Sequence, residues 1–295
     1  MTLQTDVRDF LTSRRARITP EQLALPAYGR KRRVPGLRRE EVALLAGMSV
    51  DYYNQLERGN LRGVSESVLV SVARVLRLDE AEHSHLFDLW RAANAGPSGE
   101  RRTLTGTVRP GLRRLLDAMT EAPAGILNHR MDILAANRLG RALFSDVLSG
   151  SGNLAHFAFL DPRGRDLYAD WDEAADDAVA VLRTATGSNP EDPELSALVA
   201  ELSTRSEEFR TRWAAYDVRF HRTGTKRLHH PVAGVLDLSF EAMDIAPDPG
   251  LVLLAYTAPV GSPSADALRT LANWAVTQER GTDAERPETD ALFGS

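Results

Sequence analysis

The stretch from Leu37 to Gly59 constrains the fold of this chain of 295 residues more than any other feature. Its pattern predicts a helix, a tight turn and a second helix. Ala43 stands where the two helices would cross and where a small side chain is required, and Gly47 supplies the permissive backbone of the turn. Ser49 is a typical residue to cap the second helix, and Tyr53 would then point to a core. The segment therefore predicts a small helical domain.

Apolar residues recur at helical spacing on both sides of this segment. A cluster of Gly, Pro and Ser follows at 95–99 and is typical of a linker. We therefore expect an all-α domain over residues 1–95 and a linker over 96–106. The helices predicted in this domain are Asp6–Arg15, Leu37–Ala46, Val50–Arg58, Ser65–Arg77 and Asp79–Ala93.

The remaining sequence mixes helical and strand patterns, which predicts an α+β domain over 107–278. A polar, aperiodic segment over 279–295 is expected to be a disordered tail. Strands are predicted at Gly125–Asn128, Met131–Ala135, Gly234–Phe240 and Leu251–Thr257, and helices at Leu112–Met119, Asn137–Leu148, Trp171–Thr186, Asp192–Ser203 and Glu207–Tyr216.

The net charge of −5 hides an asymmetry between these two parts. Residues 1–95 hold 15 basic and 12 acidic side chains, a net of +3, whereas the remaining residues carry a net of −8. Six basic residues fall within 30–39 with no acid among them. Such a cluster indicates a polyanionic partner for the first domain, although a solvated surface loop is the alternative.

Several classes of protein are excluded or disfavoured by what the sequence lacks. It has no Cys, which excludes disulfides, thiolate zinc sites and a Cys nucleophile. It has no apolar run of membrane-spanning length and no apolar leader, so we expect a soluble cytoplasmic protein. Neighbouring His229 and His230 would point to opposite faces of a strand, which is poor for chelating one metal ion. No catalytic constellation is visible, so we expect neither enzymatic activity nor a cofactor.

The sequence resembles a known family in both parts. Residues 1–95 resemble the lambda-repressor-like, or Xre-type, helix-turn-helix domain, through EEVALLAG, the LERG helix end and the helix after Ser65. The segments RPGLRRLLDAM, DILAANRLGRALF and GTKRLHHPVAGVLDLSFEAM resemble regulators with an MmyB-like ligand-binding domain. The resemblance implies a five-helix DNA-binding domain followed by a PAS-like α+β domain.

The resemblance also implies a set of DNA contacts. Ser49, Val50, Asp51, Asn54 and Gln55 would lie at or near bases, where Asn can pair with adenine and Asp can accept from cytosine. The alternative for Asp51 is a second acidic cap of its helix. Phosphate contacts, which position a protein without reading sequence, would come from the basic loop and from residues around the two helices: Arg32, Arg33, Arg38, Arg39, Tyr52, Arg58 and Arg62.

For the second domain, relatives imply a hydrophobic small molecule such as a fatty acid. An apolar lining with a few polar anchors is typical of such sites. The candidate residues are Phe157, Phe159, Trp171, Trp213, Arg222, His229, His230 and Phe240. For each aromatic residue the alternative is an ordinary place in the core.

Together these features predict a ligand-responsive transcriptional regulator. It would bind a palindromic operator in double-stranded DNA as a homodimer, and a hydrophobic effector would bind the second domain. Two alternatives remain for that domain, namely a dimerisation or protein-interaction module without a ligand, and a small-molecule enzyme. An apolar cavity would favour the sensor, and a packed domain without one would favour the interaction module.

Overall fold

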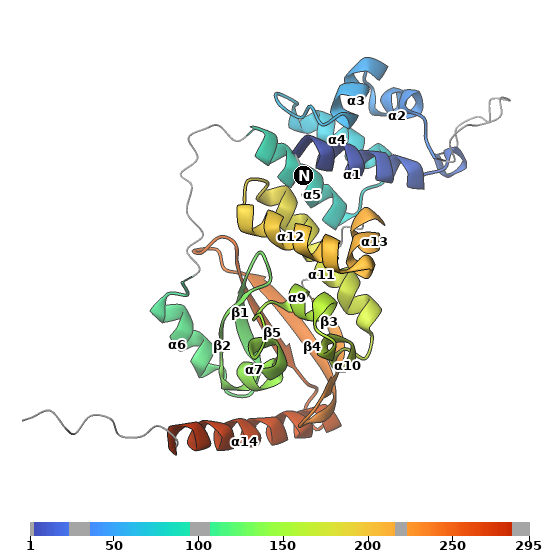
Figure 1. Ribbon diagram of the computed structural model, residues 1–295. Helices are drawn as coiled ribbons and strands as arrows, with labels where there is room; N and C mark the ends of the chain where they lie inside the picture. Colours follow the sequence, from blue (N-terminus) through green and yellow to red (C-terminus); the bar gives the residue numbers. More distant parts are fainter. Residues whose placement is uncertain (1–2, 24–35, 95–106, 216–222, 285–295) are drawn as a thin grey trace, which may run out of the picture. The chain divides into compact units, whose positions relative to one another are not determined.

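A computed structural model describes residues 3–23, 36–94, 107–215 and 223–284 (Figure 1). The predicted phosphate contacts Arg32 and Arg33, the candidate ligand residue Arg222 and the predicted linker therefore lie outside the described residues. The chain forms two compact units, one of residues 1–102 with 176–220, and one of residues 103–175 with 221–295. The first unit thus includes a segment that the sequence analysis assigned to the second domain.

The described part of the first unit is helical. From its N-terminal segment come α1 (Leu3–Arg17), the short 3-10 helix η1 (Pro20–Leu23), α2 (Arg39–Ala46), α3 (Val50–Glu57), α4 (Glu66–Val75) and α5 (Glu80–Asn94). The later segment supplies the end of α11 (Trp171–Ser188), α12 (Pro193–Arg205) and α13 (Glu207–Ala215). Each helix predicted over residues 1–95 is present, with ends that differ by a few residues, because the apolar spacing fixes the helix better than its ends.

The core of α1 to α5 consists of the apolar residues that repeat at helical spacing. Val7 and Phe10 of α1, Val42 of α2, Tyr53 of α3 and Leu86 of α5 are all fully buried in one cluster. Ala43 is fully buried as well, and α2 packs against both α3 and α4. The small side chain at Ala43 thus stands in the core beside the neighbouring helices, as the sequence predicts.

The second unit contains an antiparallel sheet of five strands, within the part of the chain that the structure describes. The strands lie in the order β2-β1-β5-β4-β3. They are β1 (Ala124–Asn128), β2 (Ile133–Ala136), β3 (Thr223–His230), β4 (Gly234–Asp244) and β5 (Leu251–Thr257). The helices are α6 (Pro110–Ala118), α7 (Arg138–Leu143), α8 (Ser145–Leu148), α9 (Leu154–Leu160), α10 (Arg163–Leu167), the start of α11, and α14 (Pro263–Ala284).

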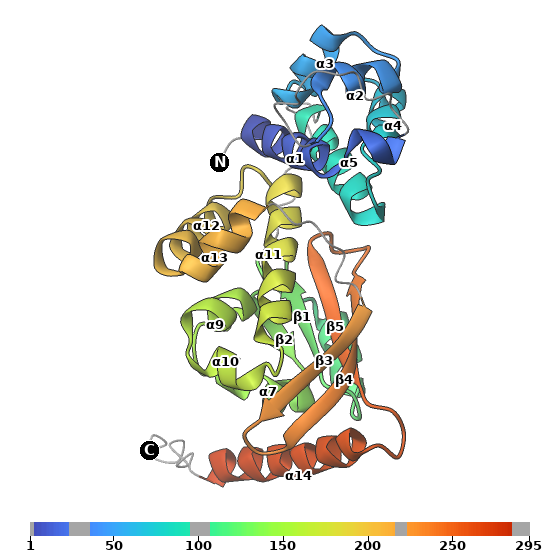
Figure 2. The same cartoon turned by 90° about the vertical axis from the view of Figure 1, so that its right-hand side faces the viewer.

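Helices cover both faces of the central strands. One cluster joins α7, α9 and α14 to the sheet and includes Phe157, Leu236 and Leu271. A second cluster joins Leu116 of α6 to Ile126 of β1 on the other face. Figure 2 shows α9 and α10 beside the sheet and α14 across its end. Strand β1 is buried along its whole length for this reason, and the predicted α+β architecture is confirmed.

Some elements differ from the sequence prediction. The helix predicted over Asn137–Leu148 is interrupted at Phe144 and forms α7 and α8. Strand β3 was not predicted, because it lies at the sheet edge and most of its residues are polar, with every second residue exposed. Helix α14 was also not predicted and continues to Ala284, so the first residues of the expected disordered tail are helical.

Candidate DNA-binding and ligand-binding sites

The turn between α2 and α3 has the backbone that the sequence predicts. Gly47 has φ of 70° and ends α2 in the left-handed conformation. The amide of Met48 donates to the carbonyl of Ala43 over 2.9 Å. At the other end of α2, the amide of Arg38 donates to Oε2 of Glu41 over 2.7 Å. These bonds satisfy polar groups that the ends of α2 would leave unpaired, and they fix where α2 begins and ends.

Helix α3 presents one face to the core and another to solvent. Oγ of Ser49 accepts from the amide of Tyr52 over 3.1 Å, so this side chain is a cap, as predicted for it. Tyr53, Leu56 and Glu57 are buried. The side chains on the open face are those implied as DNA contacts: Val50, Asp51, Tyr52, Gln55 and Arg58 are exposed, and Asn54 is partly exposed.

A buried carboxylate anchors α3 to the helices around it. Glu57 is 1% exposed, and both of its oxygens accept from Arg15 of α1, over 2.9 Å each. Oε1 also accepts from Nε of Arg39 over 2.9 Å and from the hydroxyl of Thr12 over 3.2 Å. Burial alone would raise the pKa of Glu57, but the hydrogen bonds from Arg15 and Arg39 outweigh it and hold this pKa below its usual value.

Arg15 also binds the residues that lead into α2. Nη1 of Arg15 donates to the carbonyl of Leu37 over 2.8 Å, and the amide of Leu37 donates to the carbonyl of Arg15 over 3.1 Å. Gly36 allows this approach, since a Cβ on it would lie 2.5 Å from that carbonyl oxygen. Arg15 therefore joins α1, the entry to α2 and the end of α3.

The basic residues implied as phosphate contacts differ in how exposed they are and in whether they are bound to other side chains. Arg39 is bound to Glu57, and its side chain is still 53% exposed. Arg58 caps the end of α3 through its backbone and is exposed, as is Arg62. Arg38 is only partly exposed. Arg58 and Arg62 thus have free access to solvent, whereas Arg39 also has a structural role.

The candidate ligand residues do not form one site in the described structure. Trp213 belongs to the first unit, where its ring stacks on Phe209 at 5.3 Å between centroids. The others described belong to the second unit. Phe157 and Phe240 are buried in the core cluster, and Trp171 donates from Nε1 to the carbonyl of Ala158 over 2.8 Å. Phe159 packs edge-on against Trp171, with 5.9 Å between ring centroids.

The two neighbouring histidines lie on opposite faces of β3. His229 is exposed, and His230 is buried. Nδ1 of His230 accepts from the amides of Val232 and Ala233, each over 3.2 Å, so Nε2 carries the proton and donates to the carbonyl of Ala142 over 3.1 Å. Burial lowers the pKa of His230. This neutral imidazole holds the turn between β3 and β4.

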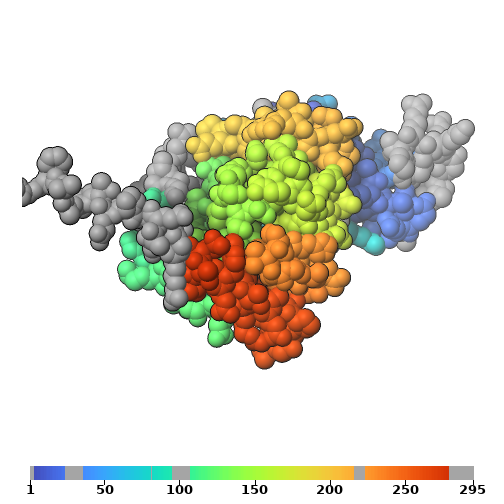
Figure 3. Space-filling model, turned by 60° about the horizontal axis from the view of Figure 1, so that its bottom comes forward, coloured from blue at the N-terminus to red at the C-terminus, as the bar shows by residue number. Residues whose placement is uncertain are grey.

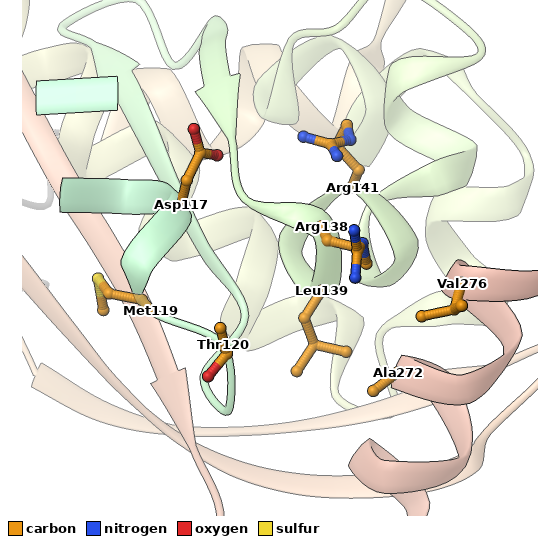
Figure 4. A pocket seen from close by; sticks show the side chains of 8 residues that line it. All are labelled: Asp117, Met119, Thr120, Arg138, Leu139, Arg141, Ala272 and Val276. Carbon is orange, nitrogen blue, oxygen red and sulfur yellow. The ribbon is translucent and has the colours of Figure 1, made fainter. Parts of the chain in front are cut away.

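Two cavities lie elsewhere in the second unit. The first, here called the helical cavity, has a volume of about 310 Å³ and is lined by α6, α7, α14 and the residues after α6 (Figure 4). Figure 3 shows the surface of α14 that faces solvent on this side of the unit. The residues lining the helical cavity are Asp117, Met119, Thr120, Arg138, Leu139, Arg141, Ala272 and Val276.

The second cavity is larger and more polar. It has a volume of about 710 Å³ and lies along β3, β4 and the segment that leads into α14. Thr225, Arg227, Asp237 and Ser239 are among its lining residues. None of the candidate ligand residues from the sequence analysis lines either of these two cavities.

One residue fixes the position of the helical cavity. Oδ1 of Asn137 accepts from the amides of Gly140 and Ala124, over 2.7 and 3.1 Å. Its Nδ2 donates to the carbonyls of Met119 and Ala122, over 2.6 and 2.7 Å. This buried amide therefore ties the residues after α6 and the start of β1 to the first turn of α7. The residues after α6 and helix α7 form two of the walls of the cavity.

Comparison with protein families assigns both parts of the chain. The family model of the MmyB-like transcription regulator ligand binding domain matches residues 108–271. The chain belongs to this family. A helix-turn-helix domain model matches residues 9–86, which include α2, the turn and α3. No match was found among curated proteins. No helix in the described ranges has both the length and the apolar character that crossing a membrane requires.

The sequence patterns did not identify three residues that support or orient the exposed face of α3 in this MmyB-like regulator. They are Arg15, Glu57 and Asn60, the last of which binds Gln55 just beyond α3. The burial of Glu57 could have been predicted, because it lies four residues after Tyr53 on the buried face of the same helix. A carboxylate on a buried face requires a charged partner, and such a partner could have been sought.

Proposed function

We propose that this MmyB-like regulator is a cytoplasmic homodimer that reads a palindromic operator and responds to a hydrophobic small molecule such as a fatty acid. Its second unit would be a PAS-like sensor without enzymatic activity or cofactor. The matched families support a ligand-responsive transcriptional regulator, and the dimer, the operator symmetry and the effector class are our extension.

The observation that carries the DNA-binding part is the construction of α3. Its first turn is capped by Ser49, and its last turn is anchored by Glu57. Glu57 lies on the buried side of the helix and the Ser49 cap lies at its N-terminal end, so Val50 and Gln55 are left exposed to solvent on a helix held at both ends. A second helix of this kind enters the major groove in helix-turn-helix proteins, with the residues of its N-terminal part at the base edges.

The chemistry of the helical cavity supports an amphipathic effector. Leu139, Ala272 and Val276 supply an apolar wall, and two basic residues, Arg138 and Arg141, line the cavity beside the acidic Asp117. Guanidinium groups pair well with carboxylates. An effector with an apolar body and a carboxylate head therefore fits this lining better than a neutral apolar molecule would.

The response would operate by a shift of populations. The effector can change operator binding only by as much as its affinity differs between a DNA-competent and an incompetent arrangement. In a dimer of helix-turn-helix domains, two half-sites about one helical turn apart are expected, with centres separated by roughly 34 Å.

The DNA-binding proposal is tested by selecting operators from a random DNA library with the full chain. We expect a palindromic sequence to be enriched. Asn54→Ala should then weaken binding to the selected operator more than binding to random DNA, because base contacts discriminate and phosphate contacts do not. Equal weakening of both would contradict a base contact by Asn54.

The effector proposal is tested with palmitate as the probe and its methyl ester as the control for the charged head. We expect palmitate to bind the full chain and to change operator affinity, and the ester to bind more weakly. Arg138→Gln with Arg141→Gln should reduce palmitate binding, whereas Arg113→Gln, an exposed position on α6 outside the cavity, should not. Unchanged palmitate binding by the double variant would exclude the helical cavity as the site.

A further inference from the structure

The amide of Gln55 is held by the residue that follows the end of α3. Nδ2 of Asn60 donates to Oε1 of Gln55 over 2.6 Å, and the backbone amide of Asn60 donates to the backbone carbonyl of Gln55 over 3.1 Å. Both side chains are exposed. The oxygen end of the Gln55 amide therefore faces Asn60, and the NH₂ end faces away from it.

The side-chain amide of Asn54, also on α3, likewise has its NH₂ end toward solvent. Oδ1 of Asn54 is buried and has no hydrogen-bond partner among the described residues. The Asn54 side chain is partly exposed. Its Nδ2 makes no hydrogen bond to the described residues, and it is not one of the buried atoms that lack a partner. The NH₂ group is thus the end of the Asn54 amide that meets solvent.

These orientations change what the two amides can read. An Asn or Gln side chain recognises adenine with both ends, because its oxygen accepts from the N6 amino group while its NH₂ donates to N7. Guanine offers two acceptors, N7 and O6, at the same edge. The bond from Asn60 uses only one of the two lone pairs of Oε1 of Gln55, but it turns this oxygen toward Asn60, so the NH₂ group is the end that can reach a base. In this orientation Gln55 can still donate to guanine, whereas adenine is offered only half of its usual pair.

We infer that Asn60 is a specificity-determining residue, which orients Gln55 as a hydrogen-bond donor and so directs it to guanine rather than adenine. Asn60 acts through Gln55 and is a positioning residue, not a base contact. The inference rests on the proposed function, since it assumes that α3 lies in the major groove. It differs from the expectation that Asn on α3 pairs with adenine.

The experiment measures the affinity of the full chain for its selected operator with each of the four base pairs at one position. That position is identified as the one at which Gln55→Ala removes the preference. The wild-type chain should prefer guanine to adenine there by roughly tenfold, the size of one good base contact. Replacing that guanine with 7-deazaguanine should weaken wild-type binding and have no effect on Gln55→Ala.

Two variants of Asn60 test its role. Asn60→Ala leaves the Gln55 amide free to turn, so the ratio of guanine to adenine affinity should fall several-fold. Asn60→Asp introduces a carboxylate, which can only accept; it should bind the NH₂ group of Gln55 and present Oε1 to the groove. The preference should then move to a base with an exposed amino group, adenine or cytosine.

Arg62→Ala is the matched control, because Arg62 is exposed and lies two residues beyond Asn60. It should weaken all four operators equally. A wild-type preference for adenine, or a base preference that neither Asn60 variant changes, would overturn the inference while leaving sequence-selective binding intact. Failure of the proposed function would look different, since the wild-type chain would then select no operator at all.

Discussion

Glu57 in the last turn of α3 and Arg15 in α1 form a two-point ion pair in which each carboxylate oxygen lies 2.9 Å from a guanidinium nitrogen. The pair connects the helix that carries the candidate base contacts to a helix that carries none. Arg39 binds the same carboxylate from the first position of α2. The orientation of α3 is therefore set by charge as well as by apolar packing.

Glu57→Gln should destabilise the first unit. Removing one partner of a buried ion pair leaves the other charge without compensation, which costs about 3 kcal/mol or more. The measurement is urea unfolding of the full chain, followed by circular dichroism. Glu40→Gln is the matched control, because Glu40 is exposed on α2, and it should change the stability by less than about 0.5 kcal/mol. Equal effects of the two substitutions would show that the ion pair contributes nothing measurable.

The stabilisation by Glu57 should depend on pH in a defined direction. The pKa of Glu57 is lowered in the folded chain, so the unfolded chain takes up a proton first as the pH falls. The contribution is therefore complete above the unfolded pKa of about 4.3 and is lost as the pH falls through the lower folded value. The stability difference between the wild type and Glu57→Gln should be constant above about pH 5 and shrink in acid. A difference that grows in acid would contradict the assignment.

Gly47→Ala should destabilise the chain through the backbone alone. A Cβ at this position would meet no atom within 4 Å, but φ is 70°, which alanine adopts at a cost of about 1 kcal/mol. Gly47→Asn should cost less, because asparagine tolerates this conformation. The control is Gly111→Ala in α6, where φ is not positive and the same substitution should stabilise by a few tenths of a kcal/mol or more. Thermal unfolding measures all three.

Arg62→Ala should lower the salt dependence of DNA binding. Each phosphate contact releases a counterion, so losing one contact should reduce the slope of log affinity against log salt by about 1. Fluorescence anisotropy at several salt concentrations measures the slope. Arg39→Ala is less informative than the sequence indicated, because it also removes a partner of Glu57. An unchanged slope for Arg62→Ala would remove Arg62 from the interface.

The sequence predicted the parts of this chain in which local pattern and fold agree. The turn at Gly47, the cap at Ser49 and the buried Tyr53 all follow from residue types at fixed spacing. Contacts between distant residues do not follow from such patterns. The pairing of Arg15 with Glu57 joins positions 42 residues apart and requires the packed helices to exist first.

The candidate ligand residues show the same limit. The sequence distinguishes aromatic residues from polar ones, but it does not distinguish an aromatic residue in a core from one in a cavity wall. Phe157 and Phe240 are part of the core cluster. The residues that do line the helical cavity, such as Arg138 and Val276, include exposed and partly exposed positions whose spacing carried no signal.

The helical cavity has walls from three helices, and its lining runs from Asp117 to Val276 in the sequence. It exists only while α6, α7 and α14 are all docked, so an unfolded chain offers no such site. Whatever binds there must stabilise the folded state by mass action, by about 2.7 kcal/mol at a free concentration one hundred times its dissociation constant. A rise in the melting temperature therefore reports an occupant of the helical cavity whatever the chemistry of that occupant.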